Sequence, residues 1–187
     1  MERKKMAHAI GLIAWGYLFL YFNLNLGSLN LIPSWVGYLL MGKAIKELKE
    51  ASPAIGLLGP LCILLAALEL WFWALTLIGI NSQHYLLQLL SLLLAVAALY
   101  FHFQLLTNLV EALGRAGETW RKELLNLRTV RTVLSAVMAL PVQWKEHFAV
   151  TVILAIAGVL VGISISAVLF WIRNALFKSL CPAEEKE

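Results

Sequence analysis

The sequence predicts an all-α integral membrane protein. We expect one domain, residues 1–187, built as a bundle of six helical spans with both termini in the cytoplasm. Hydrophobic residues make up 61% of the chain and charged residues 14%, with a mean hydropathy of +0.80. A soluble domain has about 25% charged residues. Four apolar runs reach or exceed the roughly 20 residues that a helix needs to cross a bilayer. Lys and Arg cluster between these runs.

The candidate spans are residues 7–26, 29–42, 53–80, 85–113, 132–144 and 148–172. The second and fifth have only 14 and 13 residues, and as helices they rise about 20 Å against a hydrocarbon core of about 30 Å. If both cross, Lys145 is the only one of the 15 basic residues on the outer side. If neither crosses, this bias disappears. Because cytoplasmic loops are enriched in Lys and Arg, we expect both to cross.

The first run follows a short basic N-terminus, as in a signal peptide. It stays apolar to about Phe22, however, and no cleavage site with small residues follows it. We therefore expect it to be retained as the first span.

The second span is predicted to begin near Pro33 and Ser34, since proline is tolerated in a first helical turn and serine can cap free amides there. Residues 43–51 then continue as a cytoplasmic amphipathic segment. The chain ends in a polar tail, residues 179–187.

A second amphipathic segment is predicted at residues 114–131. Its apolar stripe includes Trp120, and its basic face includes Arg121, Lys122 and Arg128. A helix of this kind lies in the membrane interface against anionic headgroups. The alternative is a docking surface for a partner subunit.

Glu69 is the strongest candidate for a functional residue. It is a lone carboxylate in the middle of residues 53–80, beside Trp71 and Trp73. Counting about 1.5 Å per residue from Ile80 places it about 16 Å deep. An ionisable group at that depth is costly and marks a functional site by default.

Trp15 and Tyr17 lie at a similar depth on the first span. A carboxylate among aromatic rings at low dielectric suits a lipophilic cation, through charge pairing and cation–π attraction. The sequence thus predicts a solute site formed by Glu69, Trp73, Trp15, Tyr17 and Trp71. Two alternatives are open. Glu69 is protonated and hydrogen-bonded within the bundle to Tyr17, Tyr38 or Ser135, or it contacts lipid or a partner.

Three stripes of small or polar residues are expected to meet in the bundle, because helices in lipid pack through such residues. The stripes are Cys62, Ala66, Glu69, Trp73 and Thr76 on the third span; His84, Gln88, Ser91, Ala95, Ala98 and His102 on the fourth; and Thr151, Ala155, Gly158, Gly162 and Ser166 on the last.

Several classes of function lack the residues that they need. The chain contains no Asp, which removes the usual metal-binding Asp of nucleotide hydrolases and the aspartyl nucleophile of transport ATPases. Cys62 and Cys181 predict no disulfide framework. His84 and His147, in predicted outer loops, fall short of a metal site. We expect no catalytic residues, no metal, no cofactor and no nucleic-acid partner.

Residues 23–40, NLNLGSLNLIPSWVGYLL, combine an Asn/Gly turn with a proline that leads into a Gly-Tyr-Leu helix. This segment resembles one in small, uncharacterised multispanning membrane proteins of Gram-positive bacteria. The resemblance implies a bacterial cytoplasmic membrane and carries no activity.

Three hypotheses for function follow, in this order. The first is a membrane protein that binds or transports a small cationic or amphiphilic solute around Glu69. The second is a non-catalytic membrane subunit that docks a partner protein. The third is an intramembrane enzyme that uses Glu69 or His102 as a general acid or base.

Overall fold

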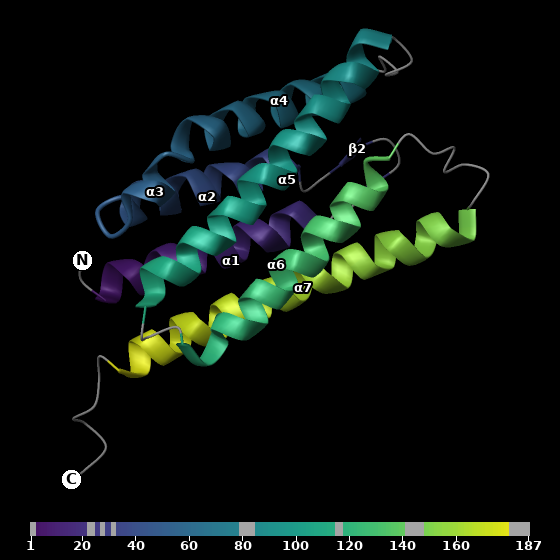
Figure 1. Ribbon diagram of the computed structural model, residues 1–187. Coiled ribbons are helices and arrows are strands. Elements are labelled where there is room, and N and C mark those ends of the chain that lie inside the picture. The colour runs from purple at the N-terminus through teal and green to yellow at the C-terminus, as the bar shows by residue number, and fades with distance from the viewer. Residues whose placement is uncertain are drawn as a thin grey trace.

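The computed structural model in Figure 1 describes residues 3–21, 25–26, 29–30, 33–78, 85–114, 118–140 and 148–179. Its helices are α1 (Arg3–Tyr21), α2 (Ser34–Leu48), α3 (Pro53–Gly56), α4 (Gly59–Leu77), α5 (Tyr85–Leu113), α6 (Glu118–Met138) and α7 (Phe148–Lys178). An antiparallel pair of two-residue strands, β1 (Asn25–Leu26) and β2 (Leu29–Asn30), lies between α1 and α2.

Local sequence explains several helix ends. Pro53 opens α3 and Pro60 lies in the first turn of α4, where a missing amide proton costs nothing. Gly114 follows α5 with a φ of 49°, the left-handed conformation in which many helices end. Glu118 at the start of α6 and Lys178 in the last turn of α7 each oppose the charge of the helix dipole.

The long helices of the described chain close into a ring in chain order. Helix α1 packs between α7 and α2, α2 between α1 and α4, and α4 between α2 and α5; α6 packs between α5 and α7 and completes the ring. Figure 1 shows these helices running side by side, with the start of α1 and the end of α7 at the same end of the bundle. Successive long helices therefore run in opposite directions.

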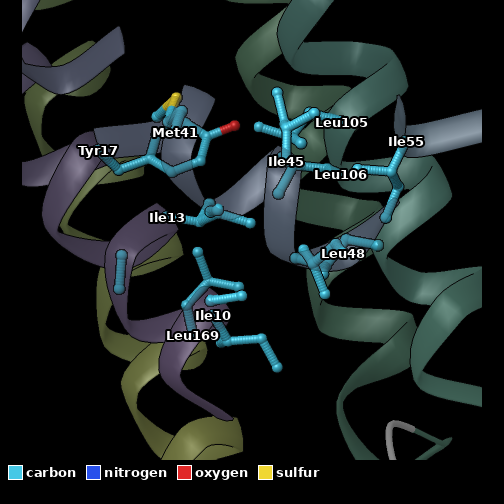
Figure 2. Packing of buried hydrophobic residues seen from close by; sticks show 14 of the residues in the cluster. Ile10, Ile13, Tyr17, Met41, Ile45, Leu48, Ile55, Leu105, Leu106 and Leu169 are labelled. Carbon is cyan, nitrogen blue, oxygen red and sulfur yellow. The ribbon is translucent and has the colours of Figure 1, made fainter. Parts of the chain in front are cut away.

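The buried core is formed mainly by α1, α2, α5 and α7. Figure 2 shows Ile10 and Ile13 of α1, Ile45 and Leu48 of α2, and Leu105 of α5 packed together. The outward faces carry many exposed large apolar side chains, among them Ile63, Leu64, Leu70, Leu92, Leu93, Val96, Ile153, Ile156 and Leu160. An exposed apolar surface of this extent marks a membrane or protein contact.

Three helices of the described chain are long and apolar enough to cross a membrane. They are Pro53–Leu77, Leu86–Leu113 and Phe148–Lys178, with mean hydropathies of 2.1, 2.0 and 2.7. The prediction of a helical protein with apolar spans in these three regions is therefore confirmed.

Some predicted boundaries differ from the structure. The first helix ends at Tyr21 rather than at residue 26. Residues 53–80 contain two helices, α3 and α4, because the Gly59-Pro60 pair interrupts the run. The last helix continues past residue 172 to Lys178. Residues 180–187 of the predicted tail lie outside the described residues.

The largest difference concerns α6. Its sequence joins most of the predicted amphipathic segment 114–131 to part of the apolar run 132–144 in one helix, and no glycine or proline interrupts it. In the same way, α2 runs through residues 43–48. A change of hydropathy alone does not end a helix, since only backbone chemistry or tertiary packing does so.

Candidate functional site at the centre of the ring

Two glycines bring α1 and α2 into backbone contact. A Cβ at Gly37 would lie 2.7 Å from the carbonyl oxygen of Gly16, and a Cβ at Gly16 would lie 2.9 Å from the carbonyl oxygen of Gly37. Only glycine permits this approach. Tyr17 and Tyr38 each follow one of these glycines, and both side chains are buried.

His102 of α5 lies between these two tyrosines. Its Nε2 is 3.3 Å from the Tyr38 hydroxyl and its Nδ1 is 3.2 Å from the Tyr17 hydroxyl. The Phe101 ring packs against both Tyr38 and His102. In a neutral imidazole one nitrogen donates and the other accepts, so one tyrosine donates to the ring and the other accepts from it. The group links three helices and satisfies all three buried side chains.

Arg131 of α6 continues this polar line toward the other side of the ring. Its Nε donates a hydrogen bond of 2.8 Å to the Tyr21 hydroxyl. Its guanidinium carbon is 5.6 Å from the centre of the Tyr17 ring and 5.8 Å from that of Tyr21, within cation–π range. No carboxylate in the described ranges forms an ion pair with it.

Arg131 borders a cavity of about 360 Å³ between α5, α6 and α7. The cavity is lined by Tyr21, Ala95, Ala98, Leu99, Arg131, Leu134, Ser135, Met138, Ala139, Leu154, Ala155, Gly158 and Val161. Small residues on α5 and α7 leave this space, because their side chains are too short to meet across it. The lining is apolar apart from Arg131, Ser135 and the hydroxyl of Tyr21.

The predicted solute site is only partly brought together. Glu69 is partly buried on α4. Trp73, one turn further along α4, packs edge-on against Trp35 of α2, with ring centres 6.2 Å apart. The indole nitrogen of Trp35 is buried and has no partner in the described residues.

The other predicted members lie elsewhere. Tyr17 reaches Tyr38 only through His102. Trp15 is 50% exposed and packs on Phe170 of α7, and Trp71 is 57% exposed. Trp15 and Trp71 therefore do not wall a common pocket with Glu69. Trp71 points outward because it is two residues from Glu69, on another helix face.

The three small-residue stripes do not form one interface. The main contacts of α4 are with α2 and α5, and those of α7 are with α1 and α6. In α7, Gly162 faces the ring of Tyr21, whereas Gly158 faces α6 and the cavity. In α5, Ala95 and Ala98 line the cavity, and Ala98 also packs against the buried core.

The predicted partner or lipid surface on α6 is divided. Arg121 and Lys122 are exposed, and Trp120 packs on Trp171 with ring centres 5.6 Å apart. These three remain available for the predicted surface. Arg128 instead turns toward α5, where Nη1 donates 2.8 Å to the Thr107 hydroxyl and the guanidinium lies over Phe103.

Sequence reasoning missed the roles of His102 and Arg131. His102 had no visible partner in the sequence, because Tyr17 and Tyr38 are 85 and 64 residues away. Arg131 was counted among cytoplasmic basic residues. The uninterrupted helical sequence of residues 118–138 was the available signal, because it places Arg128 and Arg131 one turn apart and well inside a long helix.

No family model matches this chain, and no curated protein or solved structure is similar to it. Among the described side chains, no group of three His, Cys, Asp or Glu residues could hold a metal ion.

Proposed function

We propose that this is a six-span membrane protein, with both termini in the cytoplasm, that binds or moves a small amphiphilic solute inside its helix ring. Three spans follow from length and composition. The alternation of the long helices in Figure 1 supports the other three, α1, α2 and α6. These have 19, 15 and 21 residues and rise about 28, 22 and 31 Å, so α2 alone is short for the membrane core.

The distribution of charge supports the proposed orientation. Lysines at the start of α1 and the end of α2, with Arg121 and Lys122 at the start of α6, gather at the end of the bundle where α1 begins and α7 ends. This is the bias that marks the cytoplasmic side.

Orientation can be tested by cysteine labelling in a variant that lacks Cys62 and Cys181. A membrane-impermeant maleimide should label Ser82→Cys in intact cells and Glu123→Cys only after lysis. Labelling of Glu123→Cys from outside would contradict the topology.

The cavity beside Arg131 is the observation that carries the solute proposal. At about 360 Å³ it lies at the lower end of the range for small-molecule sites, roughly 300–1,000 Å³. Its apolar lining with a few polar groups at one side suits a molecule that has an apolar part and a polar head.

The binding test uses the full-length protein in a neutral detergent and three probes that share a ten-carbon chain: decanol, decanoate and decyltrimethylammonium. We expect saturable binding of at least one probe by isothermal titration calorimetry, and loss of that binding in Ala98→Phe, which fills the cavity. Failure of all three probes to bind would overturn the proposal.

A cation site at Glu69 is the second candidate. It is favoured by the partly buried carboxylate, which has no ion pair in the described chain, and by the adjacent Trp73 and Trp35 rings. It predicts that decyltrimethylammonium binds and that Glu69→Gln removes this binding while Ala98→Phe leaves it intact. The reverse pattern would assign the solute to the cavity.

A further inference from the structure

The charge of Arg131 is not neutralised by the described part of the protein. Its hydrogen bond to Tyr21 uses Nε alone, and no described residue accepts a hydrogen bond from its two terminal nitrogens. The Tyr17 and Tyr21 rings offer cation–π contacts but no formal negative charge. Arg131 is partly buried, and a guanidinium that has lost part of its hydration is stabilised by an anion that accepts hydrogen bonds from it.

Neighbouring charges increase the positive potential at this place. Arg128 lies one turn away on α6, and its Nε is buried with no partner among the described residues. Glu69 lies on α4, which is not a neighbour of α6 in the ring. A cation entering the cavity would be repelled by Arg131, which lines it, and an anion would be attracted.

The rest of the cavity selects for an apolar body. Ala95 and Ala98 of α5 and Ala155 and Gly158 of α7 provide the space, and Leu and Val side chains complete the wall. The volume of about 360 Å³ accommodates one short chain or the first part of a longer one. Ser135, one turn from Arg131, adds a hydroxyl to the polar side.

We infer that this cavity binds a single-chain amphiphile with an anionic head, a carboxylate or a phosphate monoester, and that Arg131 pairs with that head. The inference rests on the proposed function and names its substrate class. Guanidinium forms two parallel hydrogen bonds with either kind of head. The two terminal nitrogens of Arg131, from which no described residue accepts a hydrogen bond, are the donors for this contact.

The experiment extends the calorimetry on the full chain in neutral detergent. Decanoate and decyl phosphate are compared with decyltrimethylammonium, decanol and inorganic phosphate. We expect the two anionic amphiphiles to bind at least tenfold more tightly than the other three probes. Arg131→Gln should weaken decanoate binding by about 30-fold, since truncating one partner of a buried charge pair is costly.

Three variants serve as controls. Arg121→Gln removes an exposed arginine from the same helix and should bind decanoate like the unaltered protein. Arg131→Lys keeps the charge without the planar fork and should recover part of the affinity. Ala98→Phe keeps Arg131 and should remove binding of every amphiphile, which covers the case in which Arg131→Gln fails to fold.

The outcomes separate this inference from the proposed function. If decanol or decyltrimethylammonium binds as tightly as decanoate and Ala98→Phe removes that binding, the cavity is a solute site but the preference for anions is wrong. If inorganic phosphate binds as tightly as decyl phosphate, the alkyl chain of the probe is not recognised and the inference fails. If no amphiphile binds, the proposed function fails with it.

Discussion

Small residues have opposite effects in the two halves of this ring, the first formed around the α1–α2 contact and the second by α5, α6 and α7. Where α1 meets α2, Gly16 and Gly37 let the two backbones touch, and a Cβ on either would collide with a carbonyl oxygen. Where α5, α6 and α7 meet, Ala98 and Gly158 face a cavity. A small residue therefore produces contact only where the opposite helix can advance into the space.

The polar groups of the two halves differ in the same way. In the first half, Tyr17, His102 and Tyr38 satisfy one another and are fully buried. In the second, Arg131 uses one nitrogen on Tyr21 and leaves two without a described partner. Satisfied groups stabilise the bundle, whereas an uncompensated charge is a cost that functional sites bear.

The largest effect should come from Gly37→Ala. The added Cβ meets backbone at 2.7 Å, and backbone cannot rotate away as a side chain can. We expect a loss of about 3 kcal/mol in the free energy of unfolding, at the upper end of the usual cost of overpacking. Denaturant unfolding of the purified protein in detergent, followed by Trp fluorescence, measures it.

Gly42→Ala is the matched control on the same helix. Its added Cβ would lie 3.7 Å from the Cys62 sulfur, an ordinary contact. It should change the free energy of unfolding by less than about 0.5 kcal/mol. Equal effects of the two variants would remove the argument for a close approach of α1 and α2.

The next largest loss in the free energy of unfolding, about 2 kcal/mol, is expected for His102→Leu. The variant keeps an apolar side chain but leaves the Tyr17 and Tyr38 hydroxyls without their partner, and interhelical hydrogen bonds in membranes contribute up to about 1.7 kcal/mol each. The same unfolding measurement applies. Adding Tyr17→Phe and Tyr38→Phe should recover part of the loss; no recovery would mean that packing, not hydrogen bonding, explains it.

Arg131→Met should instead increase the free energy of unfolding. Replacing a partly buried charge that has no described anionic partner by an apolar side chain of similar length should stabilise the ligand-free protein by about 1 kcal/mol, even after the hydrogen bond to Tyr21 is lost. Arg128→Met should not stabilise, because Arg128 has both Thr107 and Phe103 as partners. A lower melting temperature for Arg131→Met would show that Arg131 is structural.

The smallest effect is expected for Gly158→Ala. A Cβ there would lie 3.6 Å from the Leu134 side chain, with no atom to displace. Stability should change by less than about 0.5 kcal/mol, and decanoate affinity should fall slightly as the cavity becomes smaller. A loss like that of Gly37→Ala would mean that the two halves are packed alike.

The spans that could be predicted from sequence are those with strong local signals. Helix α5 begins and ends as predicted at residues 85 and 113, and α7 begins as predicted at residue 148. The site was predicted less well. The stripe of Glu69 and Trp73 was predicted to meet the fourth and last spans, but Trp73 packs on Trp35 of α2. Trp15 and Trp71 face outward. Helical spacing defines a face and not the helix that this face meets.

Composition, hydropathy and the clustering of Lys and Arg were sufficient to predict an all-α protein with membrane-spanning helices, since each depends on how a segment interacts with lipid or water. Tertiary structure alone decided that His102 lies between Tyr17 and Tyr38, and that Arg131 borders a cavity. Those contacts join residues up to 110 positions apart. They depend on how closely two helices approach. That distance is set by the shapes of both helix surfaces and cannot be read from the sequence of either helix alone.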